Sequence, residues 1–141
     1  MSDLETRERT RVAALMEQPT ACFVFGSNRA GVHGGGAART AFQQYGAKWG
    51  HGEGLQGRSY ALPTKDDHIE SLSIDEVAGH VARFIAVATA HPELTFAVTR
   101  VGCGLAGFTD EQIAPLFRDA PENCALPEGW LDLILNSTST E

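Results

Sequence analysis

The chain of 141 residues lacks any run of hydrophobic residues long enough to cross a membrane. Its first residues, MSDLE, lack the basic and apolar regions of a secretory signal peptide. Long basic stretches are absent and the formal net charge is -7 at pH 7, which disfavours a nucleic-acid backbone as the main partner. We therefore expect a soluble, cytoplasmic protein with no membrane partner. The sequence leaves the oligomeric state open.

Cysteine is scarce: the chain has three, Cys22, Cys103 and Cys124. Their wide spacing matches neither a zinc-ligand pair nor a disulfide framework, which is typical of a protein from a reducing compartment. The residue pattern indicates no metal site, and we expect no cofactor.

Length and composition predict one domain over residues 1–141, with an N-terminal helix in residues 1–18 and a frayed tail at 136–141. The other expected helices are 37–45, 73–91 and 109–117, and the expected strands are 21–25, 59–62 and 94–101. The apolar run 131–135 is expected to be an edge or central strand. This alternation predicts an α/β fold, a three-layer α/β/α sandwich with a mixed, mostly parallel sheet.

The glycines gather in two loops, each of which follows an apolar run and precedes a helix signal. The first loop is GSNRAGVHGGG (26–36) and the second is GCGLAGF (102–108). Without a Cβ, such loops let a ligand contact peptide N–H groups, and a helix that begins there adds N–H donors that favour anions. The pattern predicts a diphosphate or nucleotide held between the loops, near Lys65 at the carboxyl ends of the strands. The alternative is two tight turns that hold no ligand.

Two familiar nucleotide-binding motifs are excluded. The second loop contains a literal GxGxxG, GCGLAG (102–107), but too little chain follows it for the βαβ unit of a dinucleotide-binding dehydrogenase. No Gly-Lys-Ser or Gly-Lys-Thr follows either loop, so a P-loop is absent.

Three segments resemble macrodomains. NRAGVHGGG (28–36) resembles the first binding loop of that family, and VGCGL (101–105) resembles the second, which wraps the diphosphate and distal ribose of ADP-ribose. YALPTK (60–65) is similar to a segment of the branch that removes terminal ADP-ribose from proteins, where Thr-Lys supplies the catalytic lysine. The resemblance extends from about Cys22 to Phe117.

The resemblance implies a macro-like domain that binds ADP-ribose or a related nucleotide diphosphate. It also implies hydrolysis of an ADP-ribosyl glycosidic bond, with an ADP-ribosylated macromolecule as partner. The candidate catalytic residues are Lys65, Asn28 and His33. The candidate ligand-binding residues are Gly26, Ser27, Asn28, Gly34, Gly35, Gly36, Gly102, Cys103, Gly104, Leu105, Ala106, Gly107 and Phe108.

Three departures favour binding over hydrolysis. Ala106 stands where the glycohydrolase branch has its catalytic Asp, and Ala37 follows the glycine run where other hydrolytic macrodomains carry an Asp. His33 replaces the leading glycine of the first loop. The nearest carboxylates that remain as candidate acids are those of Asp66, Asp67 and Asp110.

Each candidate side chain also has a structural interpretation. Asn28 either bonds a ribose or positions a water, or it closes an Asx turn. His33 acts as an acid, a base or a phosphate contact, or it only tolerates an unusual backbone angle. Lys65 pairs with a phosphate, forms an amine adduct with an opened sugar, or is a plain surface lysine. Cys103 is an activated or a plain buried thiol, and Phe108 stacks on the ligand or covers the core.

Two functional alternatives remain. The chain is a non-enzymatic reader of an NAD-derived nucleotide, whose loop 46–57 reorders on binding. Or it is a lysine-decarboxylase-like nucleotide-processing fold, suggested by CFVFGSN (22–28), although the Pro-Gly-Gly-x-Gly-Thr and glutamate of that fold are missing. Separately, Trp49 and His51 of the loop 46–57 are candidates for a lid over the site.

Overall fold

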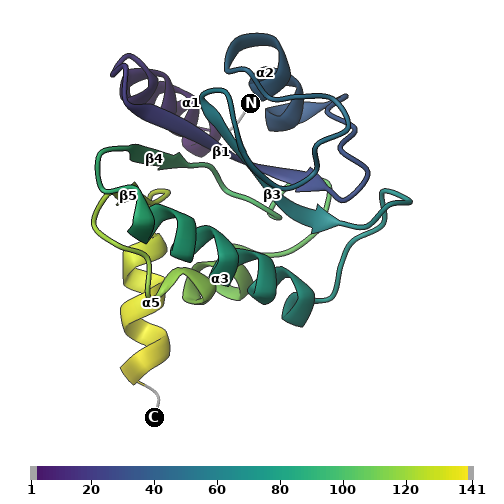
Figure 1. Cartoon of the computed structure of the whole chain (residues 1–141). Coiled ribbons are helices and arrows are strands. Elements are labelled where there is room, and N and C mark those ends of the chain that lie inside the picture. Colours follow the sequence, from purple (N-terminus) through teal and green to yellow (C-terminus); the bar gives the residue numbers. More distant parts are fainter. Residues whose placement is uncertain (1–2, 140–141) are drawn as a thin grey trace.

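The computed structural model describes residues 3–139, with side chains up to residue 137, and arranges them in three layers (Figure 1). Its helices are α1 (Asp3–Met16), α2 (Gly36–Gln44), α3 (Ile74–Ala90), α4 (Asp110–Ile113) and α5 (Trp130–Ser139), with a 3-10 turn η1 (Ala114–Phe117). Its strands are β1 (Ala21–Asn28), β2 (Gly54–Gln56), β3 (Ser59–Lys65), β4 (Thr95–Val98) and β5 (Cys124–Ala125).

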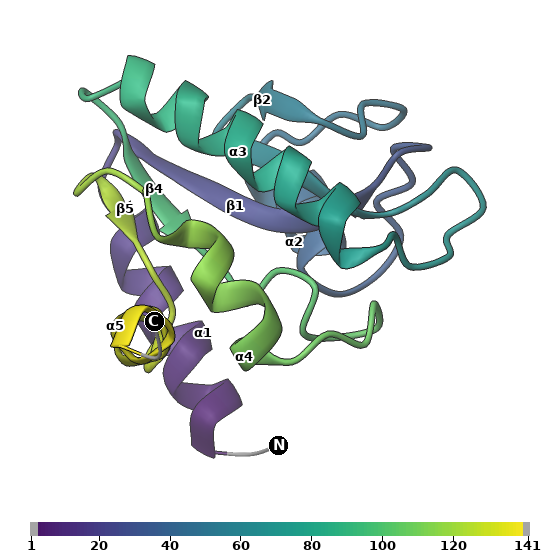
Figure 2. The same cartoon turned by 90° about the horizontal axis from the view of Figure 1, so that it is seen from below.

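The five strands form one mixed sheet in the order β2-β3-β1-β4-β5. Strand β1 pairs in parallel with β3 and β4, β4 pairs in parallel with β5, and only β2 is antiparallel to its neighbour. Helices α1 and α2 cover one face of the sheet, and α3, α4 and α5 cover the other (Figures 1 and 2). This arrangement confirms the predicted α/β sandwich with a mixed, mostly parallel sheet.

Strand β1 is buried on both faces because helices cover the sheet on both sides. Cys22 and Val24 point into the core with α3 and α5, whereas Phe23 and Phe25 point into the core with α1 and α2. A central parallel strand therefore needs apolar side chains at every position rather than at alternate ones. This explains why its sequence is a short continuous apolar run.

Helix α3 begins at the predicted capping box. The Ser73 hydroxyl accepts from the Glu76 N–H at 3.2 Å, and the Ser73 N–H donates to the Glu76 carboxylate at 3.2 Å. Val77, Val81 and Phe84 then recur at helical spacing, and each is fully buried. The helix prediction for this segment is confirmed.

We expect Gly79→Ala to stabilise the protein by about 1 kcal/mol, because glycine is a poor residue for a helix interior. Gly79 lies on the exposed side of α3, and a Cβ built there meets nothing within 4 Å. Urea unfolding checks this prediction. An unchanged or lower urea midpoint would contradict it.

The expectation of a strand at 131–135 is wrong. These residues lie in α5, where Trp130 and Ile134, one helical turn apart, are buried while Leu131 and Leu135 are exposed. Periodicity alone does not distinguish a short apolar run in a strand from one in a helix. Here the run forms a helix that packs against η1.

The expected frayed tail also needs correction, since α5 continues to Ser139. Positions 140–141 of that tail lie outside the described residues.

Strand β3 continues past its expected end. It passes through Pro63, which pairs with Ser27 of β1, and ends at Lys65. The pairing register shifts between Ser27 and Asn28. Proline is tolerated in β3 because Pro63 lies beyond Ser59–Ala61, the part that pairs with β2, so one side of the strand is an edge there. The extension carries Lys65 to the same edge of the sheet as the end of β1.

Two short strands were not predicted, and one predicted strand is shorter. Strand β2 lies inside the expected glycine loop 46–57, and β5 has only two residues. Strand β4 ends at Val98 rather than at residue 101. Residues 99–101 instead turn toward the second glycine loop.

Candidate functional site

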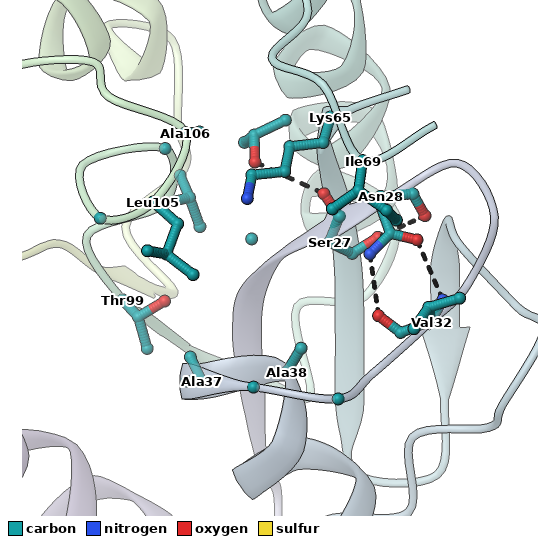
Figure 3. Close-up of a pocket in the computed structure, with 18 of the residues that line it drawn as sticks. Ser27, Asn28, Val32, Ala37, Ala38, Lys65, Ile69, Thr99, Leu105 and Ala106 are labelled. Carbon is teal, nitrogen blue, oxygen red and sulfur yellow. Dashed lines mark hydrogen bonds between the residues drawn. The ribbon is translucent and has the colours of Figure 1, made fainter. Parts of the chain in front are cut away.

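A cavity of about 520 Å³ lies at the carboxyl ends of β1, β3 and β4, between the two glycine loops (Figure 3). The sequence-predicted residues that line it are Gly26, Ser27, Asn28, Gly34, Gly35, Gly36, Lys65, Gly102, Gly104, Leu105 and Ala106. Residues not predicted also line it: Val32, Ala37, Ala38, Thr64, Ile69, Thr99, Arg100 and Val101. The fold therefore brings both loops and Lys65 to one place.

The first glycine loop ends in the N-terminus of α2, which supplies unpaired donors. Gly35 is the N-cap residue and has no side chain to cap the helix. The Arg39 N–H donates to the Gly35 carbonyl at 3.2 Å. The three N–H groups before Arg39, those of Gly36, Ala37 and Ala38, belong to the first turn of α2 and have no acceptor within the helix. This end of α2 therefore favours an anion.

The second glycine loop faces it with a similar set of donors. Its turn is closed by the Gly107 N–H, which donates to the Gly104 carbonyl at 3.0 Å. The N–H groups of Gly104, Leu105 and Ala106 have no acceptor among the described residues. Backbone donors of this kind are strongest toward charged acceptors such as phosphate oxygens.

The charge of the lining has one sign. Among the described residues, no Asp or Glu lines the cavity, although the chain contains 18 of them. Figure 3 shows the Lys65 ammonium extending into the cavity toward Leu105 and Ala106. It makes no hydrogen bond or ion pair with the described residues. The second cation, Arg100, is paired with Asp110.

The Asn28 side chain closes a turn of its own loop. Its Nδ2 donates to the Val32 carbonyl at 2.8 Å, and its Oδ1 accepts from the Val32 N–H at 2.9 Å (Figure 3). Both bonds reach Val32, four residues along the chain, so the amide closes a wider span of the loop than the two residues of an Asx turn. Asn28 therefore lines the cavity while it shapes the first loop, which favours the structural interpretation of its side chain.

The His33 imidazole is buried away from the cavity lining and is 1% exposed. Its ring packs edge-on against Phe25 and Trp49. Its Nε2 lies 2.8 Å from the Lys48 carbonyl, which only accepts, so Nε2 carries the proton and Nδ1 is left without a partner. This placement favours a packing role over acid–base catalysis.

Cys103, Gly107 and Phe108 do not line this cavity. Cys103 and Phe108 line a neighbouring cavity of about 650 Å³, on the other side of the second loop. Burial raises the pKa of the Cys103 thiol to about 11, despite the nearby Arg100 guanidinium. The thiol lies 3.6 Å from the Asp110 carboxylate and is a plain protonated thiol at neutral pH.

We expect Cys103→Ser to leave ligand binding and any turnover unchanged, because the thiol neither lines the cavity nor ionises near neutral pH. In the folded protein, alkylation by iodoacetamide at about pH 8 should be more than tenfold slower than in urea. Mass spectrometry measures both rates. Rapid alkylation of Cys103 in the folded state would contradict the raised pKa.

Asp110, one of the candidate acids, is already engaged. Its carboxylate pairs with Arg100 and accepts from the Trp130 indole N–H at 2.7 Å. The Asp66 carboxylate accepts from the N–H groups of His68 and Glu70, which holds a turn. Neither carboxylate lines the cavity, and nor does that of Asp67.

The loop 46–57 is held (braced) by hydrogen bonds within itself and does not cover the cavity. The Gln56 side chain accepts from the Lys48 N–H at 2.7 Å and donates to the His51 carbonyl at 3.0 Å. Trp49 and His51 do not line the cavity. The structure therefore gives no support to a lid made by these two side chains.

One ion-pair cluster ties this loop to α3. The Glu53 carboxylate lies 2.7 Å from His80 Nδ1 and 3.0 Å from Arg83 Nε, and Arg29 approaches His80 Nε2 at 3.3 Å. Burial alone would raise the pKa of Glu53, but the bonds to Arg83 and His80 outweigh it and hold this pKa below its ordinary value.

This lowered pKa predicts an acid-dependent contribution to stability. Because the pKa is lower in the folded chain, Glu53 stabilises the fold above its ordinary pKa of 4.5, and the contribution is lost as pH falls through the folded pKa. We expect Glu53→Gln to cost about 1 kcal/mol at neutral pH and much less in acid. Urea unfolding at several pH values checks this; a pH-independent difference would contradict it.

Comparison with protein-family models, with curated proteins and with solved structures found no significant match for this chain. The described residues contain no cluster of His, Cys, Asp and Glu suited to a metal ion. Within residues 3–139, no helix has both the length and the apolar character needed to span a bilayer.

Proposed function

We propose that this chain is a divergent macro-like domain that binds ADP-ribose or a related nucleotide diphosphate in the cavity between its glycine loops. The observation that carries the proposal is the lining: two facing sets of unpaired backbone N–H groups and one free ammonium, with no carboxylate. In a chain of net charge -7, this lining supports the binding of an anion.

The cavity also suits the rest of such a ligand. Its volume, about 520 Å³, lies within the range of small-molecule sites. Ile69 and Leu105 line it and are 43% and 89% exposed, so their side chains supply apolar contact for a sugar or base. Leu105 gains burial when a ligand covers it.

Hydrolysis of an ADP-ribosyl glycosidic bond is a second candidate function, and Lys65 is the observation that favours it. Its ammonium lies in the cavity without a protein partner, as a group that contacts a ligand would. As in the branch that the sequence resembles, the Lys65 amine, once it has lost a proton to water, would form an imine with the anomeric carbon of the opened sugar while the bond to the acceptor breaks and the acceptor leaves with a proton. Hydrolysis of the imine by water would release ADP-ribose and restore the amine. We rank binding above hydrolysis as the function, because no described carboxylate lines the cavity to act as the catalytic acid.

The test is calorimetric titration with ADP-ribose, ADP and inorganic phosphate. We expect micromolar or tighter binding of ADP-ribose, weaker binding of ADP and the weakest binding of phosphate. No binding of any of the three would refute the proposal.

Turnover is then assayed on an ADP-ribosylated protein with wild type and Lys65→Ala. Release of ADP-ribose by wild type alone supports hydrolysis through Lys65. Binding without release by wild type supports the non-enzymatic reader. Cleavage of a nucleoside monophosphate to free base would instead support the lysine-decarboxylase-like alternative.

A further inference from the structure

One segment of this acidic chain has almost no acidic residues. Residues 19–65 contain five of the 11 Lys and Arg residues but only one, Glu53, of the 18 Asp and Glu residues. This segment includes the first glycine loop, α2 and the braced loop 46–57. The whole-chain charge therefore hides a segment with an excess of basic residues, of which Arg29 is paired with Glu76 from outside it.

The same segment carries the exposed aromatic rings. Phe42 of α2 and Trp49 of the loop are 44% and 54% exposed, and no other Phe, Trp or Tyr among the described residues is exposed. Their ring centroids lie 5.6 Å apart. Both exposed aromatics thus form one pair, although they lie seven positions apart in the chain.

The backbone holds Trp49 in place. The Gly50 N–H donates to the Gly31 carbonyl at 2.9 Å, and the Lys48 carbonyl is bonded to His33 Nε2 at 2.8 Å. The Trp49 ring also packs edge-on against the buried His33 ring. A ring presented on a fixed backbone loses little conformational freedom on binding, which favours its use as a binding surface.

Two exposed cations neighbour these rings in the chain. Lys48 precedes Trp49, and Arg39 lies three residues before Phe42, on the same side of α2. Both side chains are exposed, and neither makes an ion pair or hydrogen bond with the described residues. We call Arg39, Phe42, Lys48 and Trp49 the aromatic–basic patch.

We propose that the aromatic–basic patch binds single-stranded nucleic acid. Exposed bases stack on Trp49 and Phe42, while Arg39 and Lys48 contact the phosphates. Unpaired bases are required, because a duplex hides the base faces that the rings would cover. The negative net charge of the whole chain disfavours a nucleic-acid backbone as the main partner. The excess of basic residues in segment 19–65 nevertheless allows this face to bind a short single strand.

The patch adjoins the cavity but is distinct from it. The first turn of α2 lines the cavity, and the same helix carries Arg39 and Phe42. None of the four patch residues lines the cavity. The proposal is therefore independent of the proposed function, although a strand bound at the patch would lie beside the nucleotide site.

The test uses fluorescence anisotropy with a fluorescein-labelled single-stranded oligothymidylate of about 15 nucleotides, at about 50 mM salt. We expect binding by wild type and a loss of about tenfold or more for Trp49→Ala and for Phe42→Ala. Trp49→Phe should restore most of the affinity, because it keeps a stacking face. Arg39→Glu and Lys48→Glu should weaken binding and flatten its salt dependence.

Matched controls lie on the opposite face of the sheet, where α5 packs (Figure 1). Leu131→Ala and Arg118→Glu remove an exposed apolar and an exposed basic side chain there, and should leave binding unchanged. Gly35→Val, which alters the cavity, should also bind the oligonucleotide as wild type does. Loss of binding in Gly35→Val would place the strand in the cavity and overturn the assignment to the patch.

Three other results would overturn the proposal: no binding by wild type, equal affinity for a duplex of the same sequence, or equal affinity for an oligoglutamate peptide. The last would identify the partner as an acidic protein segment rather than a nucleic acid. Thermal unfolding of each variant confirms that a loss of binding is not a loss of folding.

Discussion

Replacing Gly35 with valine is expected to reduce the affinity for ADP-ribose by at least about 100-fold while the protein stays folded. Gly35 lines the cavity as the N-cap of α2. A valine there would occupy space next to the unpaired N–H groups of Gly36 and Ala37 and keep a phosphate from reaching them. Loss of two hydrogen bonds to a charged group, at about 1.5 kcal/mol each, gives a change of this size.

The fold should tolerate this change. Gly35 has a φ of -151°, which is extended backbone that any residue adopts, and a Cβ built there meets nothing within 4 Å. Circular dichroism and urea unfolding measure the folding, and calorimetry measures the affinity. A smaller change, Gly35→Ala, should also weaken binding, and Gly79→Ala is its matched control, since each adds one methyl in open space and only Gly35 lines the cavity. Undiminished affinity in Gly35→Val would disprove the assignment of the anion to this loop.

Gly31→Ala is expected to be the most destabilising single change near the site, by about 3 kcal/mol or more. Gly31 has a φ of +74°, and a Cβ built there would lie 2.5 Å from the His51 nitrogen and 2.7 Å from Gly50 Cα. Backbone atoms cannot rotate aside as a flexible side chain does, so the two loops would have to separate. Separation would also break the bond from the Gly50 N–H to the Gly31 carbonyl.

Gly50→Ala separates the two causes of this destabilisation. Gly50 also has a positive φ, +87°, but a Cβ there meets nothing within 4 Å. Gly50→Ala should lower the free energy of unfolding by about 1 kcal/mol, the cost of placing an alanine in the left-handed conformation alone. Urea midpoints measure both variants. Equal losses would mean that the left-handed conformation, rather than the close approach of the two loops, accounts for the effect.

The loop 46–57 shows where prediction from the sequence ends. Its five glycines indicated a functional loop, with Trp49 and His51 as a lid. In the structure, glycine at position 52 permits contact rather than motion, because a Cβ there would lie 2.9 Å from the Arg29 carbonyl oxygen. A glycine needed for close packing and a glycine needed for mobility look the same in a sequence.

The candidate site divides in the same way. The glycine loops and Lys65 could be predicted because parallel strands bring their carboxyl ends to one edge of a sheet. The orientation of His33 and Cys103 could not, since each adjoins a lining glycine, yet His33 turns its side chain into the protein interior and Cys103 turns toward the neighbouring cavity. Thr64 and Thr99 were missed, although their positions at strand ends were a usable signal.

Local patterns in the sequence by themselves determined the α/β class, the capped helix α3, the buried strand β1 and the position of the two glycine loops. These features depend on residues close together in the chain: caps, turns and apolar periodicity. Only the tertiary structure decided that 131–135 is a helix, that no carboxylate of the described residues reaches the cavity and that Phe42 contacts Trp49. Those outcomes depend on contacts between distant segments, which packing of the two cores selects and no local pattern encodes.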